Sequence, residues 1–298
     1  MYVLATEQNR VFKVSPLGVI TVAAGTGTTG FSGDGGPAIA AQLDSPSGIA
    51  VSPTDELDIA DSGNRRIRKV SATGSITTVA GTGAQGSAGD GGPPIAARFG
   101  TLEGITVRPD GRLLVVDSEN KTIREIDLVA NTIVTVFGNG TDQGGGDGQP
   151  AIATGLKKPV DVTAHDTFFD VVDNDTGKIW EVTPDGIAHF IGGGGSQRTS
   201  GSLATTFDFK DPVAISVVDD VSGSHDLLVL DRNTSRLWRI ARTTGRVYAE
   251  AGTGSAGNAN RTGPAILAEL DSPQDIVSTP GVDYIADSGN RSIRKIVR

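Results

Sequence analysis

Ile59-Ala-Asp-Ser-Gly-Asn-Arg-Arg-Ile-Arg-Lys-Val70 is the most informative segment of this chain, because it recurs along the sequence. Close copies begin at Val115 and Ile285, weaker copies begin at Val171 and Val229, and a degenerate copy runs from residue 3 to 14. The aspartate of the segment falls at positions 61, 117, 173, 231 and 287, with an alanine at position 5 in the first copy. Successive spacings are therefore 56, 56, 56, 58 and 56, and such a period indicates a repeat architecture.

Each repeat contains four short runs of strand-forming residues. In the second repeat they are 48–51, 56–60, 66–70 and 75–80, separated by turn signals such as Pro53-Thr-Asp and Ala72-Thr-Gly. We name these strands a, b, c and d. The connections between them are short enough for hairpins, so each repeat is predicted to be one antiparallel four-stranded sheet.

The inner strands do not alternate cleanly between apolar and polar residues, since Ile67 and Val70 lie three apart. This pattern fits sheets buried on both faces. Six such sheets hide both faces when they stack around an axis, whereas solenoid repeats are usually shorter and carry fewer strands. We therefore predict an all-β, closed six-bladed β-propeller that forms a single domain over residues 1–298.

The connection from strand d to the next strand a is long and patterned. It begins as Gly25-Thr-Gly-Thr-Thr-Gly-Phe-Ser-Gly-Asp-Gly-Gly-Pro37 and continues through helix-forming residues. A proline followed by good helix formers predicts a short helical turn. The segments expected to form such turns are 37–43, 94–99, 150–156, 203–207 and 264–270.

The first and last repeats look incomplete. The first starts at strand b and the last ends on strand c, which gives five a, six b, six c and five d strands. Three explanations stay open: a clipped coding sequence, two three-stranded blades, or an edge strand donated by another chain.

The segments Ser45-Pro-Ser-Gly-Ile-Ala-Val51, Ile59 to Lys69 and Val79-Ala-Gly-Thr-Gly83, together with the Gly-Asp-Gly-Gly-Pro insert, resemble the NHL-repeat family of six-bladed propellers. The resemblance covers nearly the whole chain. It is closest to the Gly-Asp-Gly-Gly-containing repeats common in bacterial and in secreted or cell-surface proteins. The superfamily includes adhesive and sensor modules, RNA-binding domains, amidating lyases and lactonases, so the fold alone does not select a function.

The charge balance disfavours two classes of partner. The 298 residues include 26 Lys plus Arg against 35 Asp plus Glu, a formal net charge of −9. An acidic protein repels phosphate backbones and anionic lipids, so we expect no nucleic acid and no membrane insertion. The first residues do not form a signal peptide, and without cysteine there is no disulfide or thiolate metal site. The compartment is therefore unassigned by composition.

The resemblance to lactonase-like propellers implies a divalent cation held by carboxylates where the inner strands begin. At that place this chain has Glu103, Asp161 and Asp275, whose hard oxygen ligands would suit calcium or magnesium. Other repeats carry glycine or alanine at the position of Asp161, so solvated carboxylates are the competing interpretation. Apart from such a cation we expect no cofactor.

The three histidines are not expected to form a zinc site like that of the lyases. His165 and His225 fall at a-to-b turns of neighbouring repeats, and His189 falls on an outer strand d, so we predict that they do not converge. The repeated aspartate is interpreted as a structural residue of the b-to-c turn rather than a metal ligand.

Two further repeated features have a structural and a functional reading. The Gly-Asp-Gly-Gly loops, with Asp34, Asp90 and Asp147, form turns, or they bind calcium or an anion. The basic residues along the b-to-c turns and strands c pack between blades, or they form an RNA-binding face. The loops lack the strict nine-residue period of calcium-binding rolls, which favours turn formation. The net charge and the fixed repeat positions favour the structural reading of the basic residues.

We predict a non-catalytic interaction module that binds a protein or a glycan through its loop-decorated face, outside the cytoplasm. The first alternative is a metal-dependent lyase or lactonase-like hydrolase that uses the three carboxylates. The second is a self-assembling protein that forms homo-oligomers through incomplete terminal blades.

Overall fold

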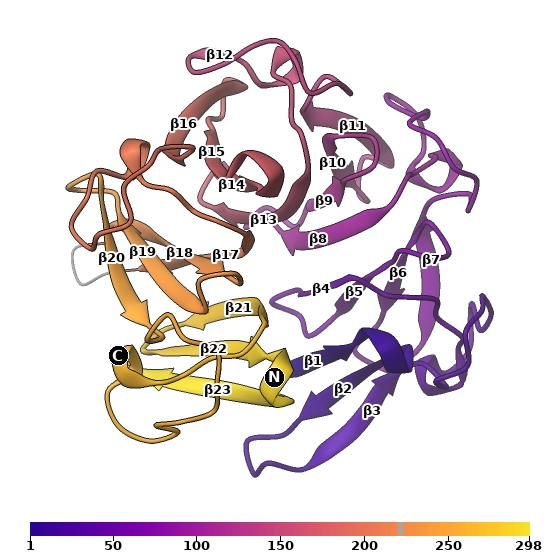
Figure 1. The fold of residues 1–298 in the computed structure, drawn as a ribbon. Helices are drawn as coiled ribbons and strands as arrows, with labels where there is room; N and C mark the ends of the chain where they lie inside the picture. Colours follow the sequence, from indigo (N-terminus) through magenta and orange to yellow (C-terminus); the bar gives the residue numbers. More distant parts are fainter. Residues whose placement is uncertain (220–222) are drawn as a thin grey trace. The chain divides into compact units, whose positions relative to one another are not determined.

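The computed structural model describes residues 1–219 and 223–298. It divides the chain into two compact units, Met1–Thr141 and Asp142–Arg298, each described separately below. Among the described residues there are 23 strands and eight 3-10 turns, without an α-helix. The strands form six antiparallel sheets, which we call blades (Figure 1).

The first unit contains three blades. Blade 1 has three strands and blades 2 and 3 have four, hydrogen-bonded in sequence order as meanders. Their strands are β1 (Tyr2–Ala5), β2 (Arg10–Val14) and β3 (Ile20–Ala24); β4 (Gly48–Val51), β5 (Leu57–Asp61), β6 (Arg66–Val70) and β7 (Ile76–Ala80); and β8 (Leu102–Val107), β9 (Leu113–Asp117), β10 (Thr122–Asp127) and β11 (Thr132–Phe137).

The second unit also contains three blades. Blades 4 and 5 are four-stranded meanders, blade 6 has three strands, and a two-residue strand β12 (Gln149–Pro150) extends blade 4 beside β16. The other strands are β13 (Pro159–His165), β14 (Phe168–Asp173), β15 (Lys178–Val182) and β16 (Ile187–Gly193); β17 (Pro212–Asp219), β18 (His225–Asp231), β19 (Arg236–Ala241) and β20 (Arg246–Ala251); and β21 (Pro273–Thr279), β22 (Val282–Asp287) and β23 (Ser292–Val297).

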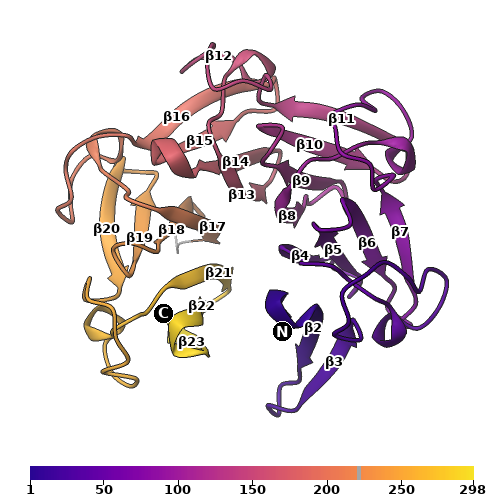
Figure 2. The same cartoon turned by 45° about the vertical axis from the view of Figure 1, so that its right-hand side comes forward.

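The predicted strand pattern is confirmed. Blade 1 holds strands b, c and d, and blade 6 holds strands a, b and c. Every residue of β5 and of β9 is buried, as expected for sheets covered on both faces. Within the first unit β4 lies against β8 (Figure 2), and within the second β13 lies against β17 and β17 against β21. Neighbouring blades of a unit thus bury each other's faces.

The predicted helical turns form, but each is a single 3-10 turn. They are η2 (Ala38–Ala40), η3 (Pro94–Ala96), η4 (Ala151–Ala153), η6 (Ala204–Thr206) and η7 (Ala265–Leu267). The residue that follows each turn is already extended, for example Ala41 at φ −78° and ψ 153°. Ala41 is fully buried, so packing of the loop against the blade ends the turn early. The remaining 3-10 turns, η1 (Thr6–Gln8), η5 (Asn174–Thr176) and η8 (Ser288–Asn290), connect strands b and c.

Candidate functional site

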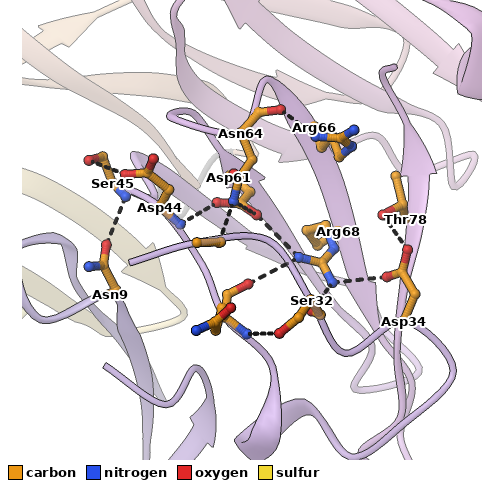
Figure 3. Close-up of polar contacts among 12 residues, drawn as sticks. Asn9, Ser32, Asp34, Asp44, Ser45, Asp61, Asn64, Arg66, Arg68 and Thr78 are labelled. Atoms are coloured by element: carbon orange, nitrogen blue, oxygen red, sulfur yellow. Dashed lines mark hydrogen bonds and ion pairs between the residues drawn. The ribbon is translucent and has the colours of Figure 1, made fainter. Parts of the chain in front are cut away.

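The repeated aspartate anchors the long d-to-a loop. Asp61 accepts hydrogen bonds from the backbone N–H of Asp44 (2.8 Å) and from the Asn64 amide (2.9 Å), and it pairs with Arg68 at 3.2 Å (Figure 3). Asp61 and Arg68 are both fully buried. Burial raises the pKa of Asp61, and these hydrogen bonds and the arginine oppose that rise. Asp61 therefore has a structural role, but its backbone partner lies in the d-to-a loop and not in the b-to-c turn, where we predicted it.

The aspartate of the Gly-Asp-Gly-Gly loop belongs to the same network. Asp34 pairs with Arg68 at 2.9 Å and accepts a hydrogen bond from the Thr78 hydroxyl at 2.7 Å (Figure 3). In blade 3, Asp90 pairs with Arg124 at 2.5 Å and accepts the N–H of Thr135 at 3.0 Å. These loop aspartates therefore tie the loop to strands c and d of the blade that follows it.

Four basic residues of strands c are held by contacts within the fold. Arg68 and Arg124 are fully buried. Arg66 donates to the carbonyl oxygen of Thr82 at 2.7 Å, and Arg236 donates to that of Thr253 at 2.5 Å. These four side chains therefore have structural roles, as the structural reading predicts for them; nucleic-acid binding itself stays untested.

The three predicted metal-binding carboxylates begin strand a of their blades. Glu103 lies on β8 of the first unit, and Asp161 and Asp275 lie on β13 and β21 of the second. Asp161 accepts the N–H of Val162 at 2.9 Å and that of Ile215, on the neighbouring blade, at 2.8 Å. These bonds give Asp161 a structural task, while the cation site itself stays a prediction.

Asp275 differs from an ordinary surface carboxylate. Its Oδ1 accepts the N–H of Ile276 at 2.8 Å. Asp275 is exposed, and partial desolvation by the protein atoms around its carboxyl group raises the pKa of Asp275 to about 6.

The prediction that the histidines stay apart is wrong for two of them. His165, at the end of β13, and His225, at the start of β18, have ring centroids 4.9 Å apart. The two blades pack face to face, so the end of β13 meets the start of β18 even though the two histidines are 60 positions apart. His189 lies elsewhere, with its Nδ1 3.6 Å from Asp147, so no three-histidine site forms among the described residues.

The two histidines belong to a polar group that we call the His165 cluster; its members are His165, Asp166, Asp170, Glu181, His225 and Arg242. Arg242 reaches both carboxylate oxygens of Asp170, at 2.7 and 2.8 Å, and pairs with Glu181. Asp170 is fully buried and lies directly opposite Glu181 on the adjacent strand. Two carboxylates so placed need a cation, and Arg242 of the neighbouring blade supplies it.

The sequence held a signal for this cluster. In blade 2 the equivalent cross-strand pair is Asp58 and Lys69, which are 3.1 Å apart. Blade 4 replaces the lysine with Glu181, so the cation must come from outside the strand pair. A search for repeats in which two like charges face each other at this cross-strand position would have selected Asp170 and Glu181.

Comparison with known proteins gives the fold. No family model matches the chain. Protein SUPPRESSOR OF QUENCHING 1, chloroplastic, of Arabidopsis thaliana is 30% identical over 217 residues, which are 67% of this chain and 20% of that protein. The chain therefore spans about a fifth of the length of this relative.

Two solved structures share the architecture. An auxiliary nutrient binding protein from Bacteroides thetaiotaomicron superposes with a TM-score of 0.70 at 15% identity, over 99% of this chain and 65% of that one. A streptogramin B lyase superposes with a TM-score of 0.55 at 16% identity, over 94% and 70%. With the six sheets, this likeness shows the predicted all-β six-bladed propeller fold. In the described part of the chain, no helix has the length and hydropathy needed to span a bilayer.

Proposed function

We propose that this chain is an NHL-type, non-catalytic interaction module that acts outside the cytoplasm and binds a protein through its d-to-a loops. The Gly-Asp-Gly-Gly repeats, typical of secreted and cell-surface members of that family, support the compartment. A nutrient-binding protein among the solved structures of this fold is consistent with a binding role. The single-domain organisation over residues 1–298 is part of the proposal.

The observation that carries the proposal is an isoleucine exposed at the same place in four loops. Ile39, Ile95, Ile152 and Ile266 are the middle residues of their 3-10 turns and are 59%, 50%, 61% and 41% exposed. Large aliphatic side chains held in water at a repeated position favour burial against a partner, at about 25 cal/mol per Å² removed from water.

The turns hold these isoleucines on a fixed backbone. Ala38, next to Ile39, is buried, and its N–H donates to the carbonyl of Gly74 at 2.8 Å. Its own carbonyl accepts the N–H of Gly25 at 2.9 Å. A loop already ordered before binding loses less conformational entropy in a complex.

The composition of these loops favours a protein over a glycan. Aromatic side chains are the usual apolar platforms of recognition sites. Phe31 is the only exposed aromatic residue among those described, and its ring is covered by the Arg66 guanidinium at 3.9 Å. The loops therefore offer aliphatic contacts without an open aromatic face.

A paired-variant binding experiment tests the proposal. Peptides selected from a random display library on the wild-type protein would be measured against a variant with all four isoleucines changed to aspartate. The control variant carries Leu17→Asp and Val129→Asp, which are 92% and 99% exposed at c-to-d turns. We expect binding to fall in the loop variant alone. Equal binding to both variants, or binders found only on a glycan array run in parallel, would refute the protein-binding proposal.

The second candidate is a metal-dependent lyase or lactonase-like hydrolase with Glu103, Asp161 and Asp275 as metal ligands. The raised pKa of Asp275 favours it, because perturbed carboxyl groups cluster at functional sites. Calcium and magnesium analysis of the purified protein separates the candidates: one equivalent of metal, lost in Asp275→Asn, would support the enzyme.

The third candidate is self-assembly through blade 6. Its edge strand β23 alternates partly buried and exposed residues, and Val297 is 72% exposed. An open edge with exposed apolar residues can pair with a strand of another copy. Light scattering during size-exclusion chromatography tests this, and a monomer at every concentration would reject it.

A further inference from the structure

We propose that His165, His225 and Asp166 form a site for one divalent transition-metal ion, of which Zn²⁺ is the type case. The site lies where the β13–β14 turn of blade 4 meets the start of β18 in blade 5. One ligand atom from each of the three residues lies within 4.8 Å of the other two. The proposed metal ligands share no residue with the predicted carboxylate site or with the loops of the proposed function.

His165 is the fixed member of the site. Its side chain is only 8% exposed, and its ring stacks on Phe168 with centroids 5.6 Å apart and planes 4° apart. Nε2 lies 3.1 Å from a carboxylate oxygen of Asp170. Nδ1 is buried and has no hydrogen-bond partner among the described residues. Such an unpartnered buried nitrogen calls for an explanation.

The partners of Nε2 indicate the tautomer. Arg242 donates a hydrogen bond to Nε2 at 3.1 Å, so in the metal-free protein the ring proton of a neutral His165 lies on Nδ1, which is buried without an acceptor among the described residues. A metal ion bound at Nδ1 would replace that proton and remove the unsatisfied N–H. Nε2 could then carry the proton and donate it to the Asp170 oxygen that lies 3.1 Å away. A metal-bound histidine usually donates the N–H of its other ring nitrogen to a carboxylate or a carbonyl oxygen.

The other two ligands can move toward His165. His225 Nε2 lies 2.9 Å from an oxygen of Asp166, and their side chains are 31% and 67% exposed. Metal–nitrogen bonds of about 2.0–2.1 Å require the three atoms to draw closer than they lie here. Exposed side chains at a turn and at a strand start can make that adjustment by changing rotamer.

The charge of the cluster favours a dication. Three carboxylates, Asp166, Asp170 and Glu181, surround the histidines, and Arg242 supplies one positive charge. With neutral histidines these four side chains sum to −2, which one divalent ion would neutralise. Two imidazoles and one carboxylate suit zinc, copper or nickel, whereas calcium and magnesium prefer oxygen ligands. Three protein ligands leave the fourth position of zinc open to water.

Zinc titration of the full chain by calorimetry, after treatment with a chelator, tests the site. We expect one equivalent bound, a zinc-dependent rise in Tm, and at least tenfold weaker binding in His225→Ala and in Asp166→Asn. His189→Ala is the matched control, because His189 is also close to an aspartate, Asp147, but lies outside the cluster. It should bind zinc like the wild type.

Cobalt supplies a second readout on the same variants. Co²⁺ bound by two imidazoles and a carboxylate gives visible absorption that a surface ion does not, and the band should vanish in His225→Ala. Melting the metal-free variants first confirms that each is folded. Absence of stoichiometric zinc, equal binding to His225→Ala, or an equal loss in His189→Ala would overturn the proposal.

Discussion

Arg242→Met should strongly destabilise the protein, because Arg242 is the counter-ion of two carboxylates. Asp170 is fully buried, Glu181 is 18% exposed, and both pair with Arg242. Removing one partner of a buried ion pair costs about 3–5 kcal/mol, since the remaining charge is left without compensation. For a chain of this size the corresponding decrease in Tm is roughly 10 °C.

A double-mutant cycle isolates this interaction. The second substitution is Asp170→Leu, because blades 3 and 5 carry Leu114 and Leu228 at the same position of strand b. The free energies of unfolding would be measured in urea near neutral pH for the wild type, both single variants and the double variant. We expect the double variant to be about 2 kcal/mol more stable than the sum of the single effects predicts.

The control for the cycle is Arg246→Met. Arg246 is exposed and donates to the carbonyl of Gly201, so the change should stay within about 0.5 kcal/mol. A loss below about 1 kcal/mol in Arg242→Met, or additive single effects, would refute the account of the cluster as a buried ionic network.

Three further predictions concern the first unit. Burial raises the pKa of Asp58 to about 6, so the folded state binds more protons than the unfolded chain between pH about 4 and 6, and stability falls as the pH rises through that window. Urea titrations should show that the free energy of unfolding of Asp58→Asn falls by about 3 kcal/mol less than that of the wild type between pH about 4 and 6. Identical pH profiles for the two proteins would contradict this prediction. Arg68→Met should speed proteolysis within residues 25–46, mapped by mass spectrometry, because Arg68 anchors that loop through Asp34; unchanged cleavage would count against the anchor. Gly25→Ala should lower the free energy of unfolding by over 2 kcal/mol, because the added Cβ would lie 2.1 Å from the Asn9 carbonyl oxygen and Gly25 has φ +91°. Gly74→Ala, at φ +85° but with open space around its Cβ, should lower it by about 1 kcal/mol. Equal losses for the two variants on urea denaturation would argue against the steric cause.

The repeat pattern was sufficient to predict the blades. The strands predicted at 56–60 and 75–80 are observed at Leu57–Asp61 and Ile76–Ala80, because local turn signals and strand propensity fix such elements within one repeat. A structural role for Asp61 was predictable from its place in the b-to-c turn, but its bond to the N–H of Asp44, 17 residues earlier, depends on how the long loop packs. The predicted helical turns are only single 3-10 turns, because the next residue, such as Ala41, is buried in an extended conformation.

The His165 cluster could not be read from a single repeat. His165 and His225 come from different blades, and Arg242 is 72 residues from the Asp170 carboxylate that it neutralises. Periodicity specifies which residues share a sheet, but the contact between two sheets depends on how their faces pack and how their turns are staggered. That packing exists only in the folded chain. The repeat pattern therefore predicts the strands of each blade, whereas the contact between the two histidines depends on two blades packing face to face.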